Sequence, residues 1–175
     1  MDKYIAFLRA INVGGHKSVK MTDIKQVFES LRLKNVQTYI QSGNVIFESK
    51  EIDSPLLEKK INGELEKLLG YKVETFVRTI QEVKAIAKKT PFTPKENETV
   101  HIVFLGEKPN KKTQQALMSL KSEADNFAIK GREIYNLRHD RENSVFSNNF
   151  IEKIIQTPGT TRNLTTINKI VEKYG

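Results

Sequence analysis

Apolar and polar positions along the first part of the chain predict a strand, a helix and then two further strands. Residues 4–9 form an apolar run that is typical of a buried central strand. Residues 22–32 carry apolar side chains at helical spacing, which predicts an amphipathic helix. Shorter β-type runs follow at 36–41 and 44–48, and the Ser42–Gly43 dipeptide between them predicts a two-residue hairpin loop.

A second helix and a fourth strand complete this set of elements. Ser54 and Pro55 are typical of the N-cap and the first position of a helix, and Gly70 is a natural C-terminal stop. Residues 73–78 then have the pattern of a strand. The resulting order, βαββαβ, is that of the ferredoxin-like split βαβ fold.

Thr79 and Glu82 predict a capping box for a helix over about 80–89, which a Pro-containing segment follows. The pattern then begins again, about 90 residues after its first copy. The second copy shows no evident final strand, because residues 160–163 lead directly into a C-terminal helix. We therefore predict an α+β fold of two ferredoxin-like (α/β-plait) subdomains, related by an internal structural duplication, plus a C-terminal helix. The expected boundaries are 1–78 for the first subdomain, 79–98 for a helix and Pro-containing linker, and 99–175 for a βαββα subdomain with the C-terminal helix.

Composition excludes several classes of site. None of the 175 residues is cysteine, so the chain can form no disulfide, thiolate zinc site, iron–sulfur cluster or cysteine nucleophile. The first apolar run is short and is broken by Arg9, which is not the pattern of a signal peptide, and no apolar stretch is long enough to cross a bilayer. We expect a cytoplasmic protein with no membrane association. The net charge of +8 favours anionic partners, nucleic acid included. The alternative interpretation is that the positive charges are spread evenly over the surface and keep the protein soluble.

The loop after the first strand is the first candidate site. Gly14 and Gly15 could present backbone amides to an anion, with His16, Lys17 and Lys20 as nearby basic side chains. The loop matches neither a P-loop nor a dinucleotide-binding glycine motif. The structural alternative is a flexible turn that needs positive φ values.

Three arginines and a polar turn extend the candidate set. Arg9 and Arg78 interrupt apolar strands, so each must be paired within the fold or face a cleft. Arg162 precedes the last helix, where a cation opposes the helix dipole unless an anion lies beside it. Hairpin and capping preferences offer structural explanations for the other polar residues, which are Gln41, Ser42, Asn44 and Asn163.

Known catalytic and metal-binding patterns are not found. The chain contains no H-E-x-x-H, G-x-S-x-G or S-x-x-K arrangement, and the three histidines are far apart in sequence. His139–Asp140 is read as a solvated turn, so no metal site is predicted. Aromatic residues lie on predicted strands, but the aromatic run of RNA-recognition motifs is absent.

Taken together, these motifs resemble those of the bacterial conserved-hypothetical family called domain of unknown function 1697. The chain departs from the family pattern at Ala10, where glycine is usual, and at Leu164, where an aromatic residue is common. The resemblance implies two α/β-plait subdomains and no established activity, substrate or cofactor. The residues that carry it are Phe7-Leu8-Arg9, Ile11-Asn12-Val13-Gly14-Gly15, Tyr39-Ile40-Gln41-Ser42-Gly43-Asn44-Val45, Val77-Arg78-Thr79, Pro91-Phe92, Thr160-Thr161-Arg162-Asn163, Thr166 and Lys169.

Our leading hypothesis is a bacterial protein that binds a small anionic ligand, a phosphate-containing metabolite or nucleotide, in a polar basic cleft between the subdomains. Two alternatives stay open: a nucleic-acid-binding module that uses the basic surface, and an enzyme of unknown reaction with His16 as the candidate base. The sequence indicates no particular cofactor and no oligomeric state. The expected ligand-binding residues are Arg9, Asn12, Gly14, Gly15, Gln41, Ser42, Asn44, Arg78, Arg162 and Asn163.

Overall fold

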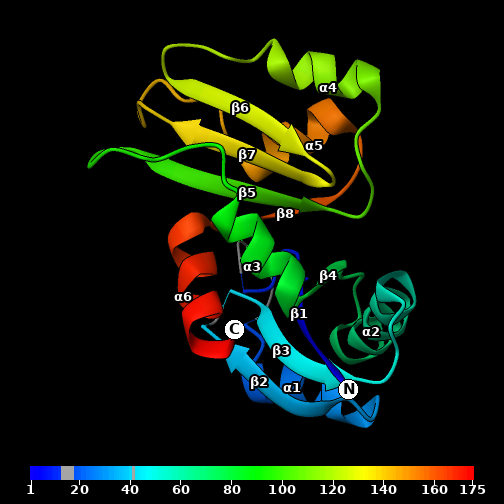
Figure 1. The fold of residues 1–175 in the computed structure, drawn as a ribbon. Helices are drawn as coiled ribbons and strands as arrows, with labels where there is room; N and C mark the ends of the chain where they lie inside the picture. Colours follow the sequence, from blue (N-terminus) through cyan, green and yellow to red (C-terminus); the bar gives the residue numbers. More distant parts are fainter. Residues whose placement is uncertain (13–17, 41) are drawn as a thin grey trace. The chain divides into compact units, whose positions relative to one another are not determined.

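The chain repeats one order of elements, βαββαβα, in two compact units (Figure 1). The computed structural model describes residues 1–12, 18–40 and 42–175. The first unit comprises Met1–Lys84 and Lys173–Gly175, and the second comprises Ala85–Glu172. The first set of elements is β1 (Asp2–Leu8), α1 (Met21–Ser30), β2 (Lys34–Tyr39), β3 (Asn44–Ser49), α2 (Ser54–Leu69), β4 (Thr75–Thr79) and α3 (Ile80–Lys88). The second set is β5 (Thr99–Leu105), α4 (Lys111–Met118), β6 (Asp125–Lys130), β7 (Glu133–Arg138), α5 (Asn148–Ile155), β8 (Gly159–Asn163) and α6 (Leu164–Tyr174).

Each unit contains a four-stranded antiparallel sheet with the same connectivity. The strand orders are β2-β3-β1-β4 and β6-β7-β5-β8, so the first strand of each set lies between its third and fourth strands. This is the ferredoxin-like arrangement, and the predicted α+β fold with an internal duplication is confirmed.

The fourth strand of the second sheet corrects the sequence-based interpretation. Residues 160–163, expected only to lead into a helix, belong to β8, which pairs with β5 from His101↔Asn163 to Leu105↔Gly159. The sequence of β8 is Gly-Thr-Thr-Arg-Asn, so hydropathy gives no sign of a strand. Its pairing with β5 makes it a strand.

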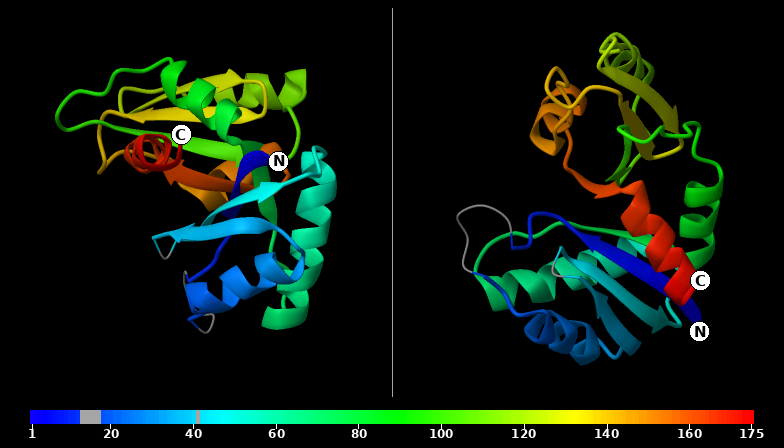
Figure 2. Two further views of the ribbon diagram at one scale, coloured as in Figure 1. Left: turned by 60° about the horizontal axis from the view of Figure 1, so that its bottom comes forward. Right: turned by 90° about the vertical axis from the view of Figure 1, so that its left-hand side faces the viewer.

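The core of the first unit explains why the apolar run of β1 is continuous. Tyr4, Ala6 and Leu8 pack against α1 and α2, which lie on one face of the sheet (Figure 2, right). The alternate residues Ile5 and Phe7 are also fully buried. With both faces of the strand buried, the period-two pattern is lost and every position is apolar. The helix residues of this core are Ile24, Val27, Phe28, Leu57, Ile61 and Leu65.

The second unit has an equivalent core on the α4 and α5 face of its sheet. Val103 and Leu105 of β5 occupy the positions that Ala6 and Leu8 hold in β1, as the strand registers show. They pack with residues of the helices and neighbouring strands. These are Leu117, Phe127, Ile134, Phe146, Ile151 and Ile155.

The helix ends carry capping residues as predicted, except that the N-cap of α2 is one residue earlier than expected. Asp53, not Ser54, is the N-cap of α2, because its carboxylate accepts a hydrogen bond from the Leu56 amide at 3.0 Å. Gly70 ends α2 in the left-handed conformation at φ 73°. Thr79 and Glu82 form the predicted capping box, with exchanged hydrogen bonds of 2.7 and 3.1 Å.

The turn between β2 and β3 is longer than predicted. Tyr39 pairs with Asn44, so the connection spans four residues, 40–43, and the expected two-residue hairpin loop is wrong. Ile40 and Gly43 have φ values of 50° and 78°. The chain thus enters and leaves this turn through left-handed conformations, which the Ser-Gly dipeptide alone does not indicate.

Candidate functional site

The loop after β1 and the β2–β3 turn lie against each other at one end of the first sheet. The Leu8 amide donates a hydrogen bond to the Gly43 carbonyl at 2.8 Å. A Cβ atom on Gly43 would stand only 2.9 Å from Leu8 Cβ and 3.4 Å from Ile11 Cβ. The two motifs singled out in the sequence are therefore neighbours in the fold.

Asn12 closes the base of the β1–α1 loop. Its side-chain oxygen accepts a hydrogen bond from the Val19 amide at 2.6 Å, and its amide nitrogen donates to the Val19 carbonyl at 3.0 Å. This two-point contact joins the residues on either side of the loop. Gly14 and Gly15, the proposed amide cradle, and Gln41 of the turn lie outside the described residues.

Backbone conformations of high energy gather at this end of the sheet. Ala10, Asn12 and Ile40 have φ values of 56°, 57° and 50°. Asparagine tolerates this region, whereas alanine and especially β-branched isoleucine do not. The φ value at Ala10 also gives a physical reason for the glycine that the resembled family has there. Such outliers concentrate at functional sites.

Asn44 and Ser42 have structural roles in the turn. Asn44 is fully buried, and its side-chain amide donates to the Tyr39 carbonyl at 3.1 Å and to Ser42 Oγ at 3.0 Å. Arg9 is half-buried, and its backbone amide donates to the Glu74 carbonyl at 2.8 Å. These contacts shape the loops beside the groove described next.

A groove of about 470 Å³ opens where α1 begins. Lys20 is the N-cap of α1, and within the described part of the chain it makes no side-chain capping hydrogen bond. Ser18, Thr22 and Thr38 contribute hydroxyl-bearing side chains to the lining of the groove at this helix start. The sequence analysis missed these three residues, because only strand pairing brings Thr38 beside the helix start. The full lining is Ser18, Val19, Lys20, Met21, Thr22, Thr38 and Ile40.

Arg78 and Arg162 occupy equivalent positions in the two units. Arg78 of β4 lies opposite Ile5 of β1. Arg162 of β8 lies opposite Ile102 of β5 in the same way. Each guanidinium donates through Nη1 to the carbonyl of the preceding residue, at 3.0 Å for Arg78 and 2.8 Å for Arg162. Both side chains are buried, and burial lowers the pKa of Arg162 to about 10. The two arginine side chains therefore make the same backbone contact at the same position of each repeat.

Within the first unit, Arg78 does not lie at the same end of the sheet as Arg9. Arg78 is four residues beyond Glu74, the backbone partner of Arg9, which corresponds to roughly 13 Å along a strand. Arg162 and Asn163 belong to the second unit, where the Asn163 side chain accepts from the Thr165 amide at 2.9 Å and caps α6. The structure brings together Arg9, Asn12, Ser42 and Asn44 at one end of the first sheet.

The comparisons with known proteins establish the family. A family model described as "Protein of unknown function (DUF1697)" matches residues 1–135. The chain belongs to this family. The family prediction is confirmed, and the DUF1697 match ends within β7, so the 160–163 motif lies beyond it.

A solved structure shares the fold of this DUF1697 chain. It is the conserved bacterial protein SP0830 from Streptococcus pneumoniae, with a TM-score of 0.77 and 20% sequence identity. The alignment covers 98% of this chain and 97% of the other. No curated protein matches the chain. None of the described helices is both long and apolar enough to cross a membrane.

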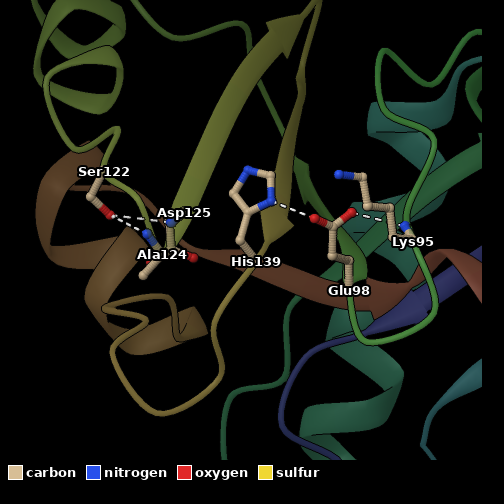
Figure 3. Close-up of polar contacts among 6 residues, drawn as sticks. All are labelled: Lys95, Glu98, Ser122, Ala124, Asp125 and His139. Atoms are coloured by element: carbon tan, nitrogen blue, oxygen red, sulfur yellow. Dashed lines mark hydrogen bonds and ion pairs between the residues drawn. The ribbon is translucent and has the colours of Figure 1, made fainter.

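A carboxylate and a histidine of the second unit connect two of its loops (Figure 3). The Glu98 carboxylate contacts His139 Nδ1 at 2.7 Å and accepts from the Lys95 amide at 2.8 Å. The amide hydrogen bond and the histidine lower the pKa of Glu98. In the part of the chain that the structure describes, no three or more His, Asp or Glu side chains are grouped to hold a metal ion.

His101 lies in a partly buried environment beside an aromatic ring. Its ring stacks on Phe146 with centroids 4.8 Å apart, and Nδ1 lies 3.2 Å from the Asn136 side-chain oxygen. Burial and, to a smaller extent, the positive charge of Arg138 lower the pKa of His101. The folded protein therefore favours neutral His101.

This shift predicts that acid destabilises the second unit. At pH values between the lowered pKa of folded His101 and the unfolded value near 6.5, the unfolded chain binds more protons than the folded protein. The contribution of His101 to stability is therefore complete above about pH 6.5. It falls below that pH, by at most about 1.4 kcal/mol per pH unit. Urea unfolding at pH 5 to 7.5 measures the slope. His101→Phe should flatten it. An unchanged slope in His101→Phe would assign the pH dependence to another group.

Proposed function

We propose that this protein binds a small anion, a phosphate-containing metabolite or nucleotide, in the groove at the start of α1. The observation that carries the proposal is the lining: Ser18, Lys20, Thr22 and Thr38 line a groove at a helix start whose N-cap residue makes no side-chain capping hydrogen bond. Hydroxyls and amides donate hydrogen bonds to phosphate oxygens, and the helix dipole favours negative charge at this end.

The surroundings of the groove support this chemistry. Asn12 hydrogen-bonds Val19, one of the lining residues, so this contact fixes the described residues next to the groove. Ile40, whose backbone is in the left-handed conformation, contributes another part of the lining. A net charge of +8 attracts anions to the protein as a whole.

The test is isothermal titration calorimetry with inorganic phosphate, pyrophosphate and adenosine monophosphate. Loss of a charge-assisted hydrogen bond in Lys20→Ala should weaken binding about tenfold or more. Thr22→Val, which removes one hydroxyl at nearly constant shape, should cause a smaller loss. Lys59→Ala, at an exposed lysine of α2, is the control and should leave affinity unchanged.

Two results would contradict the proposal. Absence of binding by all three anions excludes a phosphate site, and equal losses in Lys20→Ala and Lys59→Ala indicate general charge attraction. Binding of an oligonucleotide that weakens steeply with salt would support the nucleic-acid alternative, because several phosphates would then be contacted at once.

A further inference from the structure

A second pocket of about 260 Å³ lies in the first unit at the opposite end of its sheet. The register places Lys34 and Glu48 at this end and the Tyr39–Asn44 pair at the end beside the groove. We call it the α2 pocket, because α2 supplies one wall. Its described lining is Met1, Leu31, Arg32, Leu33, Lys34, Ser49, Lys50, Glu51, Leu57, Lys60 and Ile61.

The inner part of the α2 pocket is apolar. Leu33, Leu57 and Ile61 are 7%, 2% and 0% exposed, and all three belong to the hydrophobic core between sheet and helices. These side chains are held by their core contacts and expose almost no surface, so they form a fixed floor beneath the pocket. A bound apolar group would gain hydrophobic free energy mainly by covering Met1, which is 66% exposed, and the half-buried Leu31, both of which line the pocket.

The outer part of the α2 pocket is strongly cationic. Its lining includes Arg32, Lys34, Lys50 and Lys60, against Glu51 as the one carboxylate among the described lining residues. Glu51 lies 3.6 Å from the Lys60 ammonium group. The excess positive charge of the pocket therefore comes from the exposed residues Arg32, Lys34 and Lys50.

Arg32 is held at the pocket by an unusual backbone conformation. It follows the last turn of α1 with φ 61°, a position where glycine is the usual residue. The Arg32 amide bonds to the Glu29 carbonyl at 2.9 Å and the Leu33 amide to the Phe28 carbonyl at 3.3 Å. This is the hydrogen-bond pattern of a Schellman motif. Arginine at this position adds a cation to the pocket lining at a conformational cost.

We propose that the α2 pocket binds a small amphipathic anion, a molecule with one phenyl-sized or short acyl group and one carboxylate or phosphate. The volume lies just below the range of pockets for drug-sized ligands, which fits a compact molecule. A neutral apolar molecule would leave the cations without a counter-charge, and an inorganic anion would leave the exposed apolar surface of Met1 and Leu31 in water. The proposal does not depend on the groove at α1, because the two sites share no lining residue.

Titration of ¹⁵N-labelled full-length protein tests this by backbone amide shifts in NMR. The probes are phenyl phosphate and hexanoate, with inorganic phosphate and benzyl alcohol as their separate halves. At least one amphipathic probe should bind tenfold or more tightly than either half, and should shift the amides of residues 31–34 and 49–51. The stronger of the two probes identifies phosphate or carboxylate as the preferred group.

Substitutions separate this pocket from the groove. Arg32→Asn keeps a residue that tolerates positive φ, and together with Lys50→Gln it should weaken the amphipathic probe about tenfold or more. Lys59→Gln and Lys20→Ala should leave that affinity unchanged. The proposal is overturned if neither amphipathic probe binds, if phosphate alone binds as tightly, or if Lys20→Ala rather than Arg32→Asn removes binding.

Discussion

Asp125→Ala is expected to lower the free energy of unfolding by about 3 to 5 kcal/mol. Asp125 is fully buried, and its carboxylate accepts three hydrogen bonds. The donors are Asn136 Nδ2 at 2.9 Å, Ser144 Oγ at 2.8 Å and the Val145 amide at 2.9 Å. Alanine would remove every acceptor at once and leave the buried Asn136 amide with only a 3.4 Å contact to the Asn126 carbonyl.

The effect should be concentrated in the second unit. Asp125 connects the β6–β7 pair to Ser144 and Val145, which precede α5, so its loss frees that connecting loop. Urea unfolding measures the total loss, and amide hydrogen exchange locates it by comparing β6 and β7 with β1 and β3. Asp140→Ala, in an exposed turn of the same unit, should cost much less than Asp125→Ala. Equal costs for the two variants would show that the buried network adds little.

Gly43→Ala should lower stability by about 2 to 4 kcal/mol and disrupt the groove at α1. The left-handed backbone at φ 78° accounts for about 1 to 2 kcal/mol. The rest comes from the new Cβ, which would meet Leu8 Cβ at 2.9 Å and the Leu8 carbonyl oxygen at 3.3 Å. Because neither is the end of a flexible side chain, the turn itself must move away from β1.

Two other glycines provide matched controls for Gly43→Ala. Gly131 has φ 58°, but a Cβ there would meet only the Glu133 carboxylate at 3.7 Å, so Gly131→Ala should show the backbone cost alone. Gly63 lies within α2 with open space around it, and Gly63→Ala should raise stability by about 0.5 to 1 kcal/mol. Thermal and urea unfolding rank the three variants. If Gly43→Ala costs no more than Gly131→Ala, the close packing of turn against strand is refuted.

Anion affinity adds a second measurement on Gly43→Ala. Ile40, which lines the groove, belongs to the same turn, so displacement of the turn should weaken binding in the groove. The α2 pocket lies at the other end of the sheet, and binding there should persist in any folded Gly43→Ala protein. Loss at both sites would indicate unfolding rather than a local change.

The sequence by itself determined the elements that depend on local patterns. Helical spacing predicts α1 and α2, the capping box of Thr79 and Glu82 starts α3, and Gly70 ends α2. The continuous apolar run of β1 indicates a strand buried on both faces. Repetition of these patterns was enough to predict two ferredoxin-like units, and the motifs were enough to identify the family.

Tertiary structure alone decided the features that depend on partners distant in the chain. The polar segment Gly159–Asn163 is a strand because β5 pairs with it, and Arg78 and Arg162 are equivalent because both lie on such strands. The groove gathers Ser18, Thr22 and Thr38 only after β2 is placed beside the start of α1. Hydropathy and capping signals report on a few neighbouring residues, whereas strand pairing and pocket lining join residues across long separations. Residue patterns therefore predicted the framework, and packing determined which side chains meet on it.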